Sequence, residues 1–183
     1  MTFLDLARKR QSDRGYSDRP VSREQIERCL EAAALAPSAC NSQPWFFVVV
    51  DDRELRLQVA EHLQDMVMNR FVASAPVLVA VVAETPSLVP RLAGSLKDKP
   101  YYLMDIGMAV ENLCLQATDE ELGSCILGWF DEQGVKRLLG VPRGKRVPLV
   151  ICLGYPLDPS TRPKVRKGKE ETWSYNGYRQ KES

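Results

Sequence analysis

Three short, continuous runs of valine-rich apolar residues constrain the fold of this chain more than any other feature. They cover residues 45–50, 77–83 and 147–153. Unbroken apolar runs of this length are typical of strands buried in a core, whereas alternation with polar residues would indicate a half-exposed strand. A shorter strand is predicted at residues 124–127, so a β-sheet is expected in the core.

Stretches with helical spacing of apolar residues separate these strands, which indicates a mixed α and β domain. The clearest start is at Ser22, which has capping-box spacing to Gln25, and this helix is expected to end before Pro37. Residues 84–100 hold three prolines and are predicted to form a loop or lid. Helices are predicted at residues 2–10, 22–36, 53–70, 102–117 and 131–139.

The composition indicates one globular domain and excludes several classes of protein. The 183 residues fit a single domain, and no linker rich in glycine and serine divides them. The net charge of +1 argues against binding of nucleic acid or anionic membranes through overall charge. No apolar run is long enough to span a membrane, and the N-terminus does not fit a secretory signal. Five scattered cysteines without a CxxC pair indicate reduced thiols in a cytoplasmic protein, with no metal site.

The C-terminal segment, residues 154–183, differs in composition from the rest of the chain. It has few aliphatic residues and many charges, yet it keeps Trp173, Tyr175 and Tyr178. Two interpretations remain open: the segment packs as an arm, for example on another subunit, or it is disordered.

Motifs of the common catalytic sites are absent from the sequence. There is no GxGxxG after a strand, no P-loop, no HExxH and no GxSxG. The single histidine, His62, lies on a mostly polar predicted helix, where a solvated surface role is favoured over a catalytic one. If the protein is an enzyme, a bound cofactor is therefore expected to carry the reactive chemistry.

Two basic segments far apart in the sequence could bind one phosphate. The first places two guanidinium groups and a hydroxyl at the end of a predicted helix, a combination that suits a phosphate, although a solvated basic helix end is the alternative. The second, residues 162–169, holds five cations and no acid, and taken alone it is typical of a solvated tail. A single phosphate held from both sides would explain both segments. The residues of the first segment are Arg10, Gln11, Ser12 and Arg14.

A third candidate is the loop of residues 36–45, which joins a predicted helix to a predicted strand. Its small residues allow the backbone to approach a flat ligand, and Ser38, Asn41 and Gln43 offer donors and acceptors. The alternative is a loop of turn-forming residues that only ends the helix. The density of polar groups between two buried elements favours the ligand-binding interpretation.

Five segments together resemble the nitroreductase-like FMN-dependent oxidoreductases. In chain order they are RQSDR, APSACNSQPWFFVVV, GSCILGWFDE, VPLVICLGYP and RPKVRKGKEE, and they span nearly the whole chain. The resemblance implies an α+β fold with a mixed, mainly antiparallel sheet flanked by helices, in an intertwined homodimer. It also implies one FMN-binding domain over residues 1–183, with residues 154–183 as a C-terminal arm.

The resemblance implies the parts of FMN that each matching position contacts. The phosphate and ribityl chain would be held by the N-terminal motif Arg10, Gln11, Ser12 and Arg14. The isoalloxazine and ribityl would be lined, from the other subunit, by Pro37, Ser38, Ala39 and Asn41. A backbone N–H facing flavin N5 would come from Ile126, Leu127 or Gly128. The phosphate would be closed by Lys164 and Arg166. Arg70 falls near a position that contacts flavin in some members, whereas Gln11 departs from the basic or aromatic residue that many members carry.

The activity implied by the resemblance is FMN-dependent reduction with NADH or NADPH. Hydride would pass from the nicotinamide to flavin N5 and on to a small acceptor such as a nitroaromatic or a quinone, in a ping-pong reaction that needs no acid or base side chain. Two alternatives remain: a flavin enzyme of another type, such as flavin fragmentation or dehalogenation, and a non-catalytic FMN-binding or redox-sensing module. The balanced charge disfavours a nucleic-acid-binding module.

Overall fold

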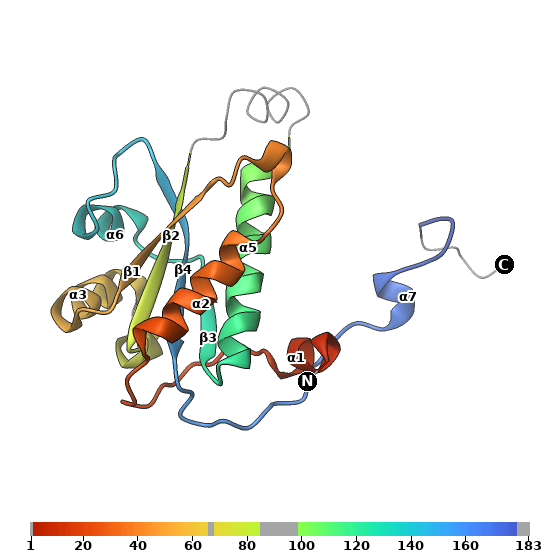
Figure 1. Cartoon of the computed structure of the whole chain (residues 1–183), viewed down its shortest axis with the longest axis horizontal. Coiled ribbons are helices and arrows are strands. Elements are labelled where there is room, and N and C mark those ends of the chain that lie inside the picture. The colour runs from red at the N-terminus through yellow and green to blue at the C-terminus, as the bar shows by residue number, and fades with distance from the viewer. Residues whose placement is uncertain (1, 66–67, 85–98, 179–183) are drawn as a thin grey trace.

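Four antiparallel strands form the sheet of the computed structural model, which describes residues 2–65, 68–84 and 99–178. Their order across the sheet is β1-β2-β4-β3, so β2 and β4 are central and β1 and β3 lie at the edges (Figure 1). All four predicted strands are confirmed. Their bounds are β1 Trp45–Val50, β2 Val77–Ala83, β3 Gly123–Leu127 and β4 Arg146–Gly154.

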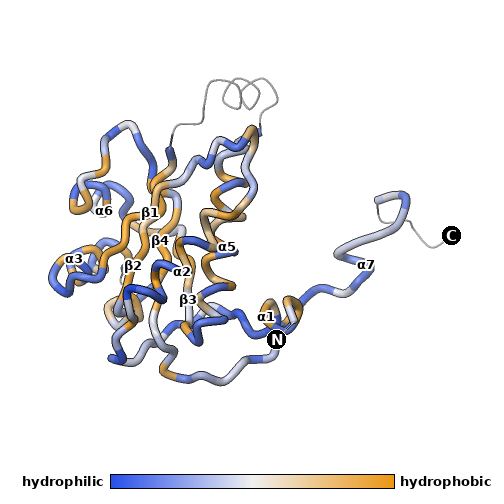
Figure 2. The backbone as a smooth tube through the Cα atoms, in the orientation of Figure 1, coloured by the Kyte–Doolittle hydropathy of each residue, from blue (hydrophilic) through white to orange (hydrophobic). Residues whose placement is uncertain are grey.

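The central strand β2 is apolar at every position because both of its faces are buried. Val79 pairs with Val49 of β1 and with Ile151 of β4, so β2 has neighbours on both edges. Successive side chains of a strand point to opposite faces of the sheet. Val79 lies in one core cluster and its neighbour Ala80 in the other. Both faces are therefore buried, and the apolar centre is visible along the strands in Figure 2.

Helices cover both faces of the sheet. One core cluster contains residues of α2 (Arg23–Ala34) and α5 (Tyr101–Asp119), and the other contains residues of α3 (Arg53–Leu63) and α6 (Glu132–Leu138). Figure 1 shows these pairs on opposite sides of the strands. The remaining helical segments are α1 Phe3–Lys9, η1 Ala39–Asn41, η2 Arg70–Ser74 and α7 Lys169–Thr172.

The predicted capping box of α2 is confirmed by two reciprocal hydrogen bonds. The Ser22 hydroxyl accepts from the Gln25 backbone N–H, and the Gln25 side-chain oxygen accepts from the Ser22 N–H, both at 3.2 Å. Each bond satisfies an N–H that the helix itself leaves without a partner. The box fixes where the chain turns from the N-terminal connector into α2.

The helix predicted at residues 53–70 is wrong at its C-terminal end, because α3 stops at Leu63. Asn69 adopts a left-handed backbone conformation with φ of 62°, which an α-helix cannot contain. Its side-chain amide donates to the carbonyls of Leu63, at 3.0 Å, and Trp129, at 3.2 Å. This amide satisfies a carbonyl at the end of α3 and ties that end to the segment after β3. Arg70 then begins the separate helix η2.

The loop predicted at residues 84–100 lies mostly outside the described residues, which resume at residue 99. The C-terminal segment passes α1 and extends away from the sheet, with the short helix α7 near its end (Figure 1). No helix was predicted there. Among the described residues, no helix is both long and apolar enough to cross a membrane.

Candidate functional site

The N-terminal connector lies along the edge strand β3. After α1 ends, Arg10 leaves the helical conformation, with φ of −56° and ψ of 126°, and the Asp13 N–H then donates to the Ser124 carbonyl at 2.9 Å. Ser12 forms an isolated parallel bridge with the same residue of β3. An edge strand has backbone groups that no neighbouring strand pairs, and the connector uses one of them. The motif residues 10–14 are thereby held beside the start of β3.

The C-terminal basic segment reaches the same place. The Lys164 ammonium donates to the Arg10 carbonyl, and the Arg162 guanidinium donates to the Ser12 carbonyl at 2.5 Å. The structure therefore brings together the two basic segments that the sequence analysis paired. We call Arg10, Lys164 and Arg166 the cation cluster.

The electrostatics of the cation cluster favour an anion. Burial lowers the pKa of Lys164, and the nearby charges of Arg10 and Arg166 lower it further, with Glu111 acting in the opposite direction. Like charges held this close repel one another in the absence of a counter-ion. A phosphate placed among them would relieve that repulsion and form charge-assisted hydrogen bonds.

One atom of the cation cluster is a hydrogen-bond donor without an acceptor. The Arg10 Nε is buried, and it makes no hydrogen bond to any residue that the structure describes. The Glu111 carboxylate lies 3.4 Å from it in an ion pair, so this donor has a counter-charge but no hydrogen-bond acceptor among the described residues. The residues present thus fit an anionic group that would accept this bond.

The remaining motif residues are placed differently. Arg14 is exposed and lines a cavity of about 250 Å³ together with Asp158 and Arg162. Gln11 lines the same cavity, but its side chain hydrogen-bonds to Asp13 and to residues of the C-terminal segment. Asp13 and Arg162 were not predicted as site residues, although both stand inside the quoted motifs.

The loop of residues 36–44 is anchored to the beginning of α5. The Ala39 N–H donates to the buried Asp105 carboxylate at 3.1 Å, and the Ser38 hydroxyl accepts from the Gln43 N–H at 2.9 Å. Cys40 and Asn41 both have a φ of 53°, so the loop is sharply turned. This conformation exposes Asn41 and the neighbouring Pro37 rather than burying them.

A single chain does not bring this loop to the cation cluster. The loop lies near the N-terminal end of α5, while α1 lies beside the C-terminal half of that helix (Figure 1). Arg10 approaches Glu111, six positions along α5 from Asp105. Pro37, Ser38, Ala39 and Asn41 are therefore separate from the phosphate-binding candidates within one copy of the chain.

The predicted flavin-ring segment lies at the far end of β3. Ile126 and Leu127 pair with Ile151 and Val150 of β4, and Gly128 follows directly after the strand. Ile126 and Gly128 are exposed. Because β3 is an edge strand, the backbone groups of every second residue face away from β4 and can meet a ligand. The cation cluster and this segment thus flank the two ends of one strand.

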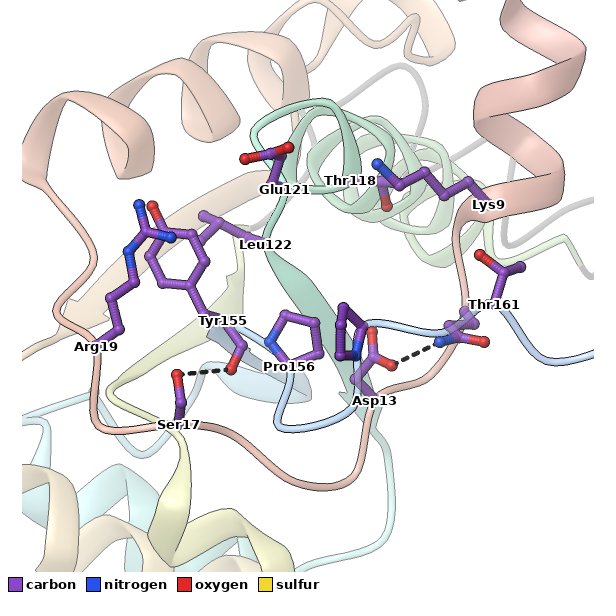
Figure 3. Close-up of a pocket in the computed structure, with 12 residues that line it drawn as sticks. Lys9, Asp13, Ser17, Arg19, Thr118, Glu121, Leu122, Tyr155, Pro156 and Thr161 are labelled. Atoms are coloured by element: carbon purple, nitrogen blue, oxygen red, sulfur yellow. Dashed lines mark hydrogen bonds between the residues drawn. The ribbon is translucent and has the colours of Figure 1, made fainter.

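A pocket of about 390 Å³ is lined by the N-terminal connector, by residues 118–122 and by residues 155–161 (Figure 3). The charges along it have both signs, from Lys9 and Arg19 to Asp13 and Glu121. The Arg19 guanidinium lies 3.7 Å above the centre of the Tyr155 ring. Gln11 is the only predicted site residue among those lining this pocket. The pocket is therefore distinct from the cation cluster.

His62 lies on the opposite face of the sheet, on α3. Its Nδ1 is 2.9 Å from Oδ2 of Asp131, the residue that caps α6. The Gly134 N–H and then His62 lower the pKa of Asp131. Both side chains are partly exposed, which agrees with the predicted surface role of His62. Among the described residues, no group of three His, Cys, Asp or Glu side chains is arranged to hold a metal ion.

Comparison with known proteins gives consistent matches. The sequence model of the Nitroreductase family matches residues 7–70 and 63–155. A protein of Archaeoglobus fulgidus, provisionally named NADH dehydrogenase/NAD(P)H nitroreductase, is 36% identical and covers 85% of this chain and 86% of its own length. An iodotyrosine deiodinase of Thermotoga neapolitana is 30% identical and covers 87% of this chain and 91% of its own length.

Solved structures show the same fold. A nitroreductase family protein from Streptococcus pneumoniae TIGR4 aligns with a TM-score of 0.79 at 28% identity, covering 94% of this chain and 99% of that one. An FMN-dependent nitroreductase from Clostridium difficile R20291 aligns with a TM-score of 0.78 at 23% identity, covering 96% and 99%. At that identity the second likeness supports the fold alone.

Proposed function

The chain belongs to the nitroreductase family, and on this basis we propose that it is an FMN-dependent oxidoreductase with NADH or NADPH as electron donor. The observation that carries the proposal is the cation cluster, whose buried Arg10 Nε is ready to donate to an anion. Bound FMN would supply the chemistry at N5, accepting a hydride from the nicotinamide and passing electrons to a nitroaromatic or quinone acceptor.

The cation cluster would hold the phosphate of the cofactor. Arg10 and Arg166 offer guanidinium forks, and Lys164 offers an ammonium, so the phosphate would be bound from two segments of the chain. Ser12 and Arg14 stand next along the connector and would contact the ribityl chain. The only anionic side chain facing Arg10 in an ion pair is Glu111, at 3.4 Å, among the residues that the structure describes.

The far end of β3 would orient the flavin ring. Ile126 presents an exposed apolar surface, and Gly128, directly after the strand, would offer a backbone N–H. A backbone donor fixed by the sheet can hold a ring atom without a titratable side chain. The protein's part in the reaction would thus be to bind, orient and tune the cofactor.

A homodimer is part of the proposal, because one chain separates the loop of residues 36–44 from the cation cluster. In a dimer, Pro37, Ser38, Ala39 and Asn41 would come from the second copy. Apolar side chains on α5 support such an interface: Met104 and Met108, one turn apart, are 53% and 40% exposed. Gly107 between them has open space above it. Residues 1–183 would form one FMN-binding domain, with residues 154–183 as an arm on the partner.

The reduced state of the cysteines supports a proposed location in the cytoplasm. All five are free thiols, and four of them are buried. Burial raises the pKa of Cys114 to about 11 and that of Cys29 to about 12, which keeps both thiols protonated and unreactive.

Reductive dehalogenation is a second candidate, favoured by the 30% identity to an iodotyrosine deiodinase. Both reactions would use the same cofactor, and they would differ in the acceptor. No comparable observation favours a module that binds FMN without turnover.

Anaerobic reduction and reoxidation of the flavin test the proposal. NADH or NADPH is mixed with the flavin-loaded protein, and the loss of oxidised-flavin absorbance is followed in a stopped-flow instrument. A nitroaromatic, a quinone or an iodotyrosine is then added in separate experiments. Rapid reduction followed by reoxidation with the nitroaromatic or quinone supports the proposal. Reoxidation by iodotyrosine alone would favour dehalogenation, and no reduction by either nicotinamide would refute both.

A further inference from the structure

The side chain of Gln11 joins two parts of the chain that are about 150 residues apart. Its Nε2 donates to the Asp13 carboxylate at 3.0 Å and to the Ser160 carbonyl at 2.9 Å. Its Oε1 accepts from the backbone N–H of Arg162 at 3.0 Å and from the Arg162 guanidinium at 3.3 Å. A primary amide has two N–H donors and one carbonyl oxygen with two lone pairs. Every one of these is occupied by protein, so the side chain has no free capacity for a ligand.

Asp13 gives Gln11 a fixed anchor. Asp13 is 9% exposed, and its backbone N–H is bonded to β3. A Cβ at Gly123 would come within 2.6 Å of the Asp13 carboxylate, so the carboxylate fills the space that this glycine leaves on β3. Figure 3 shows Asp13 accepting the hydrogen bond at the edge of the pocket. The anchor therefore belongs to the sheet rather than to the C-terminal segment.

The position of the C-terminal segment depends on a few hydrogen bonds to the N-terminal connector. Residues 157–168 contain no helix or strand, and all of them except Lys164 are exposed. Leu157 donates from its N–H to the Gly15 carbonyl at 3.0 Å, and the next contacts along the segment are those to Gln11. Lys164 then follows two residues after Arg162. An exposed segment without secondary structure is ordered only by such contacts, since it buries little apolar surface.

We propose that Gln11 is a positioning residue, which holds residues 160–162 so that Lys164 and Arg166 join Arg10 in the cation cluster. This inference rests on the proposed function, in which the cluster binds the FMN phosphate. It reassigns Gln11 from a cofactor contact to a latch between the N-terminal connector and the C-terminal segment. Asp13 fixes the Gln11 side chain to the N-terminal connector, and Gln11 in turn holds Arg162 of the C-terminal segment.

Comparison of two flavins separates the proposed latch from general damage to the fold. Gln11→Ala is expected to lower the affinity for FMN about tenfold, because the phosphate loses well-placed cations. Affinity for riboflavin, which has no phosphate, is expected to stay the same. The matched control is Gln58→Ala, which truncates an exposed glutamine on α3. A loss of affinity for both flavins in Gln11→Ala would indicate general damage to the fold and would overturn the proposal.

A double-mutant cycle separates positioning from direct contact. Gln11→Ala is combined with the pair Lys164→Ala and Arg166→Ala. If Gln11 acts through these two cations, its effect on FMN affinity disappears once they are removed, since coupled residues are not additive. An undiminished tenfold loss in that background would mean that Gln11 contacts the cofactor itself, and the proposal would fall.

The order of the C-terminal segment in the cofactor-free protein tests the positioning role of Gln11 independently of flavin binding. In the cofactor-free protein, backbone ¹⁵N order parameters of residues 160–166 are expected to fall in Gln11→Ala, from values typical of rigid backbone toward those of a flexible chain. They are expected to stay unchanged in Gln58→Ala. Unchanged order parameters in Gln11→Ala would overturn the proposal even if FMN binds. If the wild-type protein bound no FMN, the proposed function would fail, whereas the order parameters would still decide whether the latch exists.

Discussion

The Nε of Arg10 lies 3.4 Å from Oε1 of Glu111 but makes no hydrogen bond to it. The ion pair places the negative charge of Glu111 near the guanidinium, while the buried Nε–H of Arg10 has no hydrogen-bond acceptor among the described residues. Glu111 projects from the middle of α5, so it fixes Arg10 between α1 and the helix that covers the sheet. This arrangement holds Arg10 in place and leaves one strong donor for an incoming anion.

Arg10→Ala and Arg166→Ala are each expected to weaken FMN binding. A charge-assisted hydrogen bond contributes roughly 1.5–3 kcal/mol, which corresponds to about one to two decades in the dissociation constant. The fold is expected to survive, because neither residue belongs to the core. Flavin titration measures the effect, with Arg53→Ala, an exposed cation of α3, as control. Unchanged titrations for both variants would remove the phosphate assignment.

The affinity for FMN is expected to fall as the pH is raised through the lowered pKa of Lys164. Burial and then the charges of Arg10 and Arg166 depress that pKa, so the free site loses a positive charge at a lower pH than an ordinary lysine would. A bound phosphate favours the charged ammonium, so binding takes up a proton in this range. Lys164→Arg keeps its charge and is expected to flatten the profile. The dissociation constant is measured against pH, and an equally steep profile in Lys164→Arg would contradict the assignment.

Local chemistry was enough to predict most of the fold. The strand at residues 77–83 was predicted with its observed bounds, because a run of seven apolar residues rich in valine is too short for a typical helix and suits a strand buried on both faces. The start of α2 was predicted from Ser22 and Gln25, which satisfy each other within four residues. The end of α3 was missed, because it depends on Asn69 reaching the carbonyl of Trp129, a contact between distant segments.

The candidate site, too, could be predicted only in part from the sequence. That Arg10 and Lys164 share a site could be inferred, because one phosphate held from both sides explains two basic segments that lie far apart in the sequence. The environment of Gln11 could not be inferred, because its partners Ser160 and Arg162 stand about 150 positions away and are met only in the folded chain. The ion pair to Glu111 was missed for the same reason, since nothing in the spacing of α5 distinguishes that residue from any exposed glutamate.

Electron donor and acceptor are expected to compete for one face of the flavin. The sequence of 183 residues carries no second nucleotide-binding signature, so the nicotinamide has to leave before the acceptor binds. Initial rates measured against NADH or NADPH at several acceptor concentrations are expected to give parallel lines in double-reciprocal plots. Intersecting lines, together with a directly observed ternary complex, would refute this scheme.

Removal of residues 170–183 is expected to weaken the dimer and flavin binding together. Trp173 and Tyr175 are 59% and 83% exposed in one chain, and burial against a partner would remove these aromatic surfaces from water. A ligand that contacts both chains stabilises the dimer by mass action, so losing one lowers the other. The truncated chain keeps Lys164 and Arg166, so any loss of flavin is not due to missing cations.

Analytical ultracentrifugation with detection at the flavin absorbance measures both properties of the truncated chain in one experiment. The full-length chain under the same conditions is the reference for dimer stability and for flavin occupancy. A truncated protein that is monomeric and still binds FMN at full strength would show that the two events are independent.

The most direct test of the central claim is the identity and amount of flavin released from the purified, reconstituted protein. Heat or acid releases a noncovalently bound cofactor, and chromatography with absorbance detection identifies and quantifies it. The cation cluster around Arg10, whose buried Nε has no hydrogen-bond acceptor among the described residues, predicts FMN at about one molecule per chain. Release of FAD, a flavin that stays covalently attached, or no flavin after reconstitution would contradict the account.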